Sequence, residues 1–256
     1  MLVHPSGIDL SSSTLRLLAR HLRRRRREIG SRWRRLSAGR QALLTLGHLR
    51  CGDTCGRLAA GFNIGIATVC RYIREAVDVL AALAPTFEQA VSTAAQKAYV
   101  ILDGTLLPID RIAADRPFCS GKHKKHGMNI QVITDPFGHL LWASPALPGA
   151  VHDIKAARTH DIPAALTRAG IRCWADKAYQ GAGGTFRVPY QGRWDQFSAG
   201  QRAVNVSHAK IRALGEQAMA TLKQWRLLHK LRCSTTRITA IVQAVLTLHL
   251  TTSACG

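Results

Sequence analysis

Acidic residues are scarce in this chain. It carries 15 Asp and Glu residues against 36 Lys and Arg residues, which gives a formal net charge of +21 at pH 7. A charge this large attracts polyanions strongly and says little about the fold. We therefore expect nucleic acid as the main partner, with an acidic membrane surface as the weaker alternative.

Long apolar runs are also lacking. No stretch reaches the roughly 20 consecutive apolar residues that a membrane-spanning helix needs. The nearest candidate, residues 238–250, is short and is interrupted by Gln243. The N-terminal region carries no hydrophobic core of a secretory signal. The sequence therefore predicts a soluble, cytoplasmic protein.

The cysteines do not form a secreted disulfide framework. There are seven of them, an odd number, scattered along the chain. Cys51 and Cys55 make a single CxxxC pattern with no second pair, whereas a closed structural zinc site needs four ligands. The pattern therefore argues against a zinc-stabilised domain.

The N-terminal 39 residues are strongly basic. Leucines at helical spacing precede five consecutive arginines, Arg23 to Arg27, and further arginines follow within ten residues. We predict that residues 1–39 form a basic helix or arm that contacts phosphates without reading sequence. A solvated basic helix with no partner is the alternative.

Residues 40–84 have the pattern of a helix-turn-helix domain. A short helix at 53–62 and the turn "NIG" precede a longer helix at 65–83. In such a motif the second helix enters the major groove of DNA. A plain three-helix bundle is the alternative. The expected exposed readers are Thr68, Arg71 and Tyr72, and the residues expected to pack inside are Leu58, Ala59, Ile64, Val69 and Ile73.

Beyond a boundary at 84–96 the pattern changes to strands, which predicts an α/β domain over residues 97–256. The turn "DPFG" has the residues of a type I turn and joins two of the strands. Asp153 is the expected N-cap of a helix. The expected elements are strands at 98–110, 128–134, 139–145 and 171–176 and a helix at 153–170.

Two aspartates stand where a carboxylate is costly. Asp103 follows "YVIL" inside a strand, and Asp176 ends the apolar strand "IRCWA" before a glycine-rich loop. A buried carboxylate needs a partner or a cation, and ligands collect at the ends of neighbouring strands. The pair thus indicates a cation site, while a chance pair satisfied by arginines is the alternative.

The chain has only one glutamate after residue 97. This residue, Glu216, lies in a predicted helix at 208–231, where it shares one face with Arg212 and Lys223 within about 60°. An ordinary solvent face with an Arg212–Glu216 ion pair is the alternative. Three carboxylates from two strands and a helix suit two Mg²⁺ or Mn²⁺ ions that act on a phosphodiester.

Four motifs in order, "LDGTLLPI", "PGAVHD", "ADKAYQG" and "RALGEQAMATLKQWRLL", resemble the DDE transposases of bacterial insertion sequences, in the group related to eukaryotic Harbinger-type transposases. The resemblance implies an RNase H-like catalytic domain after the helix-turn-helix. It implies that Asp103, Asp176 and Glu216 are the catalytic metal ligands. Its Arg-x3-Glu-x6-Lys signature falls on Arg212, Glu216 and Lys223, with Lys223 holding DNA near the cleaved phosphate.

The chain departs from this family at positions that bind no metal. Ala209 stands where many relatives have an aromatic residue, and Ala175 and Ala178 stand where some have glycine. These departures leave the three carboxylates intact. Asp153 is a further acid that we expect either beside the metal ions or in a purely structural role.

The resemblance implies a transposase that binds the terminal inverted repeats of its element and its target DNA. It would cleave and transfer strands as a homo-oligomer on DNA, in the bacterial cytoplasm near the nucleoid. Two alternatives stay open. One is a non-catalytic DNA-binding protein, either a regulator or a domesticated relative, and the other is an RNase H-type nuclease without strand transfer.

Overall fold

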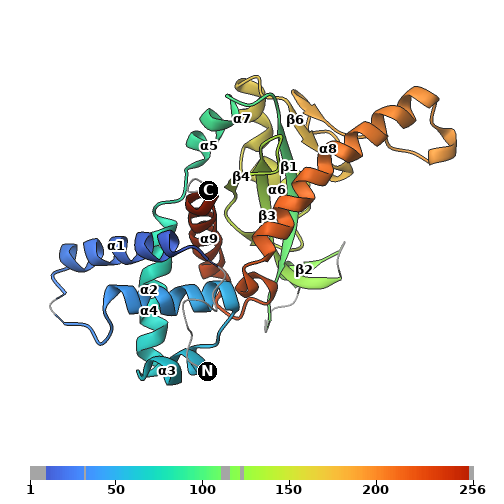
Figure 1. The fold of residues 1–256 in the computed structure, drawn as a ribbon. Helices are drawn as coiled ribbons and strands as arrows, with labels where there is room; N and C mark the ends of the chain where they lie inside the picture. Colours follow the sequence, from blue (N-terminus) through green and yellow to red (C-terminus); the bar gives the residue numbers. More distant parts are fainter. Residues whose placement is uncertain (1–9, 32, 111–115, 122–123, 254–256) are drawn as a thin grey trace. The chain divides into compact units, whose positions relative to one another are not determined.

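The computed structural model describes residues 10–31, 33–110, 116–121 and 124–253 (Figure 1). The chain divides into two compact units. The helical unit consists of Met1–Ala84 and Leu222–Gly256, and the sheet unit consists of Pro85–Thr221. The boundary at residues 84 and 85 falls where the sequence changes from helical to strand patterns.

Hydroxyl side chains begin three helices of the helical unit. Ser11, Ser37 and Thr54 each accept a hydrogen bond from a backbone N–H in the first turn of the helix that follows. A π-helical turn, Gly47–Cys51, continues the second helix. The helices are α1 (Ser12–Glu28), α2 (Ala38–Leu46), α3 (Cys55–Phe62), α4 (Ile66–Ala81) and α9 (Ile238–Ser253).

Helix α4 forms the centre of this unit. Its buried stripe includes Val69, Ile73 and Leu80, at helical spacing. The C-terminal helix α9 packs against it, and Thr247 Oγ1 donates a hydrogen bond to the Leu80 carbonyl at 3.0 Å. None of the helices within the described ranges is long and apolar enough to cross a membrane.

The compact units differ from the sequence segments that we expected to form domains. The segment 97–256 does not form one unit, because residues 222–256 group with the N-terminal helices. The physical reason is that α9 is apolar around much of its surface and α4 offers an apolar stripe to cover. The segments 1–39, 40–84 and 97–256 stay a prediction about functional units.

Helices α3 and α4 form the predicted helix-turn-helix. Asn63 ends α3 in the left-handed region, with φ of 52°. A short polar side chain tolerates this conformation. Of the five residues expected to pack inside, four are buried and Ile64 is half-buried.

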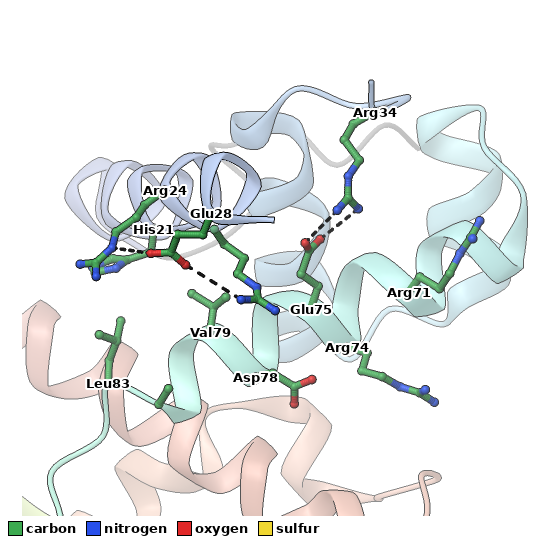
Figure 2. Close-up of a pocket in the computed structure, with 12 residues that line it drawn as sticks. His21, Arg24, Glu28, Arg34, Arg71, Arg74, Glu75, Asp78, Val79 and Leu83 are labelled. Atoms are coloured by element: carbon green, nitrogen blue, oxygen red, sulfur yellow. Dashed lines mark hydrogen bonds and ion pairs between the residues drawn. The ribbon is translucent and has the colours of Figure 1, made fainter. Parts of the chain in front are cut away.

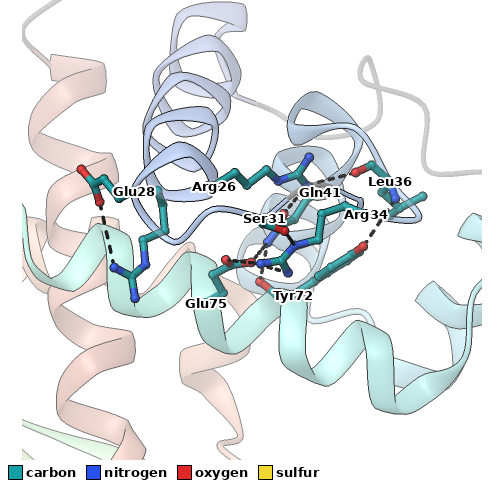
Figure 3. Close-up of polar contacts among 9 residues, drawn as sticks. Arg26, Glu28, Ser31, Arg34, Leu36, Gln41, Tyr72 and Glu75 are labelled. Carbon is teal, nitrogen blue, oxygen red and sulfur yellow. Dashed lines mark hydrogen bonds and ion pairs between the residues drawn. The ribbon is translucent and has the colours of Figure 1, made fainter.

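A layer of polar contacts holds the segment between α1 and α2 against α4 (Figure 3). Arg34 pairs with Glu75 at 3.0 Å, and Gln41 Nε2 donates to Glu75 at 2.9 Å. Arg26 donates to the Leu36 carbonyl and to Gln41 Oε1. Arg26 and Arg34 are therefore structural, and residues 12–28 form a packed helix rather than a free arm.

The sheet unit contains a mixed sheet flanked by helices. The strand order is β2-β3-β1-β6-β7, and β4 and β5 also pair with β3. Strand β1 is antiparallel to β3 and parallel to β6. The strands are β1 (Val100–Pro108), β2 (Cys119–Ser120), β3 (Lys125–Thr134), β4 (Leu140–Ala143), β5 (Leu147–Pro148), β6 (Cys173–Ala175) and β7 (Phe186–Arg187). This is the α/β, RNase H-like arrangement that the resemblance implies.

Helices cover both faces of this sheet. Helices α5 (Phe87–Ala94), α6 (Asp153–Thr159) and α7 (Ile162–Arg168) contribute to one buried core with Leu102 of β1. Helix α8 (Ala199–Lys223) crosses the other face (Figure 1). Gly215 of α8 lies so close to Ile101 of β1 that an added Cβ would be 3.0 Å from the Ile101 Cγ2. A larger residue at this position would be tight against Ile101, so α8 packs closely on β1 here.

The expected helix at 153–170 is two helices. The break falls at Asp161, whose φ is 54°, and Pro163 follows in the first turn of α7. Proline lacks the N–H that would continue α6, so the chain turns there. The expectation that Asp153 is the N-cap is also wrong, because His152 occupies that position and Asp153 is the first helical residue.

The "DPFG" turn is confirmed. The Gly138 N–H donates to the Asp135 carbonyl at 3.0 Å, which closes the turn between β3 and β4. Asp135 Oδ1 also accepts hydrogen bonds from the N–H groups of Phe137 and His139. Burial opposes ionisation of Asp135, but these hydrogen bonds prevail and lower its pKa.

Candidate active site

Parallel pairing of β1 with β6 brings two aspartates together. The register places Leu102 opposite Ala175, and the next residue on each strand is Asp103 and Asp176. Side chains alternate between the faces of a strand, so Asp103 lies on the same face as Ile101, the face that α8 covers. The two carboxylates that the sequence singled out are therefore neighbours under α8.

The Asp103 carboxyl lies in an unfavourable place for a charge. Its pKa is raised to about 6, mainly because it is buried and also because Asp176 and Asp153 place negative charges nearby. Two groups oppose the shift: the Arg212 guanidinium, and the Gly104 N–H, which donates to Asp103 Oδ1 at 3.0 Å. A cation next to Asp103 would therefore stabilise its ionised form.

Asp153 approaches β1 from the face that α6 covers. A Cβ added at Gly104 would lie only 2.3 Å from Asp153 Oδ1, so a side chain at position 104 would displace this carboxylate. Asn129 Nδ2 donates to the same oxygen at 2.8 Å. Gly104, the glycine of "LDGT", thus leaves room for the Asp153 carboxylate next to the residue that follows Asp103.

A chain of polar side chains supports Asp153, and the sequence analysis missed it. The Tyr179 hydroxyl donates to Gln131 Oε1 at 2.5 Å, Gln131 Nε2 donates to Asn129 Oδ1 at 2.7 Å, and Asn129 donates to Asp153. The signal was present in "MNIQVIT", where two polar residues alternate with apolar ones and so point to one face.

Glu216 is not drawn into this cluster. Its side chain is 66% exposed, and Arg212 Nη2 lies 3.8 Å from its Oε1. Arg212 is only 23% exposed, and its charge lowers the pKa of Asp103. This one guanidinium therefore interacts with both Glu216 and Asp103. Lys223 is exposed in the last turn of α8. Over the described part of the chain, no three Asp, Glu, His or Cys side chains are grouped closely enough to hold a metal ion.

The donor set nevertheless fits a hard divalent cation. Mg²⁺ takes oxygen ligands and is bound by one or two carboxylates together with substrate phosphates. Asp103 and Asp176 supply such a pair at the ends of adjacent strands. Glu216 is not grouped with them in the described part of the chain.

A cavity of about 360 Å³ opens beside Asp176. Cationic and aromatic side chains share its wall with the aspartate: Lys177, Arg212, Trp194 and Phe197. Positive charge attracts phosphates, and aromatic rings accept stacked bases. The surroundings of Asp176 therefore suit a nucleic-acid strand better than a small apolar ligand.

The expected DNA readers on α4 separate into two groups. Arg71 is exposed and donates to the half-buried Thr68 hydroxyl at 3.3 Å. Tyr72 was expected to be exposed, and this is wrong, because only 4% of it is accessible. Its hydroxyl accepts from the Leu36 N–H, and the Arg34 guanidinium lies 5.9 Å from its ring centroid. Tyr72 belongs to the buried stripe of α4.

A cleft of about 650 Å³ lies between α1 and α4, and arginines line its rim (Figure 2). Its three acidic residues are all paired: Glu28 with Arg24 at 2.8 Å, Glu75 with Arg34 at 3.0 Å, and Asp78 with Arg237 at 2.7 Å. Figure 2 shows Arg71 and Arg74 extending from α4, clear of these pairs. On the other side of the cleft, Arg24 and Arg25 of α1 share the one carboxylate of Glu28, which leaves an excess of positive charge there. The exposed charge of this face is therefore positive.

The raised pKa of Asp103 predicts a stabilising substitution. The raised pKa means that Asp103 ionises less readily in the folded protein than in the unfolded chain. The free energy of unfolding therefore falls as the pH rises from 3.8, the ordinary pKa, to about 6, and the full loss is present above that window. Asp103→Asn removes this loss, so we expect the metal-free protein to melt about 3 °C higher at pH 7.5. Thermal unfolding with a chelator measures this.

The gain should shrink as the pH falls from about 6 and should vanish well below pH 3.8, where Asp103 is protonated in both states. Asp195→Asn serves as the control, since that side chain is 65% exposed beside Arg193. A destabilised Asp103→Asn protein at pH 7.5 would show that the carboxylate is satisfied as it stands.

Two family models match this chain. The model described as "DDE superfamily endonuclease" matches residues 102–249, and the model described as "Helix-turn-helix of DDE superfamily endonuclease" matches residues 34–86. The chain is also similar to a putative transposase for insertion sequence element IS112 of Streptomyces albus G. The two are 29% identical over 198 residues, which cover 75% of this chain and 71% of that protein. No solved structure matches.

Proposed function

Since the chain belongs to the DDE superfamily endonucleases, whose model matches more than half of its length, we propose that it is a transposase. In this proposal it binds the terminal inverted repeats of a mobile element, cleaves the DNA strand there and transfers the end to target DNA. It acts as a homo-oligomer on DNA, in the cytoplasm near the nucleoid. Residues 1–39, 40–84 and 97–256 serve as basic segment, DNA-binding domain and catalytic domain.

The observation that carries the catalytic part is the register of β1 and β6, which makes Asp103 and Asp176 neighbours. We assign these two residues and Glu216 as the ligands of two Mg²⁺ or Mn²⁺ ions. When bound, such ions activate water and stabilise the leaving oxygen of a phosphodiester. Arg212 offsets the negative charge of the aspartates, and Lys223 holds DNA near the cleaved phosphate.

The DNA-binding part rests on α4 and on the exposed arginines. Thr68 and Arg71 lie near the N-terminal end of α4, the part of a recognition helix that contacts bases. The exposed arginines of α1 contact phosphates, which fix the protein on the duplex without specifying sequence. Tyr72 has no part in this contact because it is buried.

A cleavage assay on labelled duplex DNA that carries the element ends tests the proposal. A transposase cuts at the ends and joins them to a second duplex when Mg²⁺ is present. Cutting without joining would indicate a nuclease of RNase H type, and specific binding without cutting would indicate a regulator.

Replacing Arg71 by Ala should weaken binding to the element ends about tenfold, because a base contact from a recognition helix contributes on the order of 1–3 kcal/mol. Binding to unrelated duplex should fall much less, since the phosphate contacts remain. Titration of both duplexes at one salt concentration gives the two affinities.

Arg172→Ala is the matched control, because Arg172 is an exposed arginine of the sheet unit that precedes β6. It should leave the preference for element ends unchanged. If Arg71→Ala weakened binding to both duplexes equally, α4 would be a scaffold and not a reader.

A further inference from the structure

Two cysteines of the helix-turn-helix touch through their sulfur atoms. Cys55 is the first residue of α3, and Cys70 lies in the second turn of α4. The Cys70 Sγ lies 3.5 Å from the Cys55 Sγ, and both are free thiols. Among the described cysteines no other pair has its sulfur atoms in contact.

We propose that Cys55 and Cys70 form a reversible disulfide that joins α3 to α4 when hydrogen peroxide is present. Two thiols and one peroxide give one S–S bond and two waters, so that the sulfurs lose two electrons and two protons and the peroxide O–O bond is reduced. A thiol reductant reverses the step by exchange. This inference does not depend on the transposase activity.

Exposure decides which cysteine reacts first. Cys70 is exposed and accessible to peroxide, whereas Cys55 is half-buried. Burial and the adjoining Cys70 thiol raise the pKa of Cys55 to about 11, so Cys55 is a poor first nucleophile at neutral pH. Peroxide therefore converts Cys70 to a sulfenic acid, and Cys55 then attacks that sulfur and releases water.

The bond requires little movement of the helices. A disulfide has an S–S distance of about 2.05 Å, so the two sulfurs need to approach by only about 1.5 Å from their separation of 3.5 Å. The exposed arginines of α4, Arg71 and Arg74, keep their places. The disulfide thus locks α3 to α4 without removing the basic face.

Locking the two helices should stabilise the protein against unfolding. The link closes a loop of about 15 residues, which reduces the freedom of the unfolded chain. We expect the melting midpoint of the peroxide-treated full chain to rise by about 5 °C and to return after addition of dithiothreitol. Affinity for duplex DNA should change by less than about threefold. Inside cells such bonds are usually transient and respond to redox conditions.

Peptide mapping tests the connectivity directly. After peroxide treatment and alkylation of the remaining thiols, trypsin cuts after Arg50, Arg57 and Arg71, so Cys55 lies in peptide 51–57 and Cys70 in peptide 58–71. We expect these two peptides to be joined with the loss of two hydrogens. The same joined pair should form in Cys51→Ser, which removes the other thiol of peptide 51–57.

Cys55→Ser and Cys70→Ser should each abolish both the joined peptides and the rise in melting midpoint, whereas Cys119→Ser should abolish neither. Circular dichroism of the reduced variants confirms that they fold. A bond between Cys51 and Cys55 within one peptide, or Cys70 oxidised without a partner, would overturn the proposal.

Discussion

Asp103→Ala, Asp176→Ala and Glu216→Ala should each slow metal-dependent strand cleavage by about 1000-fold or more. Each carboxylate is assigned to hold a cation whose charge stabilises the transition state of phosphodiester cleavage. A 1000-fold loss corresponds to about 4 kcal/mol of barrier, which is the scale expected when one such ligand is lost. Single-turnover cleavage of labelled duplex with element ends gives the rate.

DNA binding should survive in these three variants, because its energy comes from phosphate and base contacts in other parts of the protein. Asp195→Asn is the control for a change of charge alone, since that aspartate is exposed and paired with Arg193. It should cleave normally. A near-normal rate in any one of the three Ala variants would remove that residue from the catalytic assignment.

The aspartate pair could be predicted because a carboxylate inside or at the end of an apolar strand is unfavourable to bury. Asp103 and Asp176 interrupt or end apolar strands, and few other roles explain a carboxylate there. The register of β1 and β6 then makes them neighbours, which no spacing along the chain could show. Glu216 was predicted by a different argument, from its place on one helix face, and its exposed side chain is not grouped with the aspartates in the described residues.

The burial of Tyr72 could have been predicted from helix periodicity, because Tyr72 lies three residues after Val69, at the spacing of the buried stripe. The sequence did not show what covers it, which is Leu36 and Arg34. Contacts of this kind join residues about 36 positions apart, so no local pattern identifies the partner. The same holds for α9, whose partner α4 is more than 150 residues away in the chain.

The supporting residues of the site were missed for a chemical reason. Asn129 and Gln131 are uncharged, and polar residues on one face of a strand usually indicate solvent. In this protein that face is buried, and the two side chains satisfy each other, Tyr179 and Asp153. Only the packing of α6 against the sheet distinguishes a buried polar chain from an exposed strand face.

This polar chain ends at Asp153, which leads to the second large effect. Asp153→Asn should slow cleavage by about 100-fold without unfolding the protein. The Asn oxygen can still accept the hydrogen bond from Asn129, so the local geometry persists, but the negative charge beside Asp103 is lost. Changing a residue that supports a metal ligand typically lowers metal affinity or activity about 10–100-fold. The rate should recover partly at higher Mg²⁺ concentration.

Asp161→Asn is the matched control for Asp153→Asn. Asp161 lies just before α7 in the left-handed region, which Asn adopts as readily as Asp, and its exposed carboxylate pairs with Arg168. It should cleave at the normal rate. A loss in Asp153→Asn as large as that in Asp103→Ala, with no recovery at high Mg²⁺, would make Asp153 a metal ligand in place of Glu216. A loss below about threefold would reduce Asp153 to a structural anchor of α6, because its charge would then contribute nothing to the reaction.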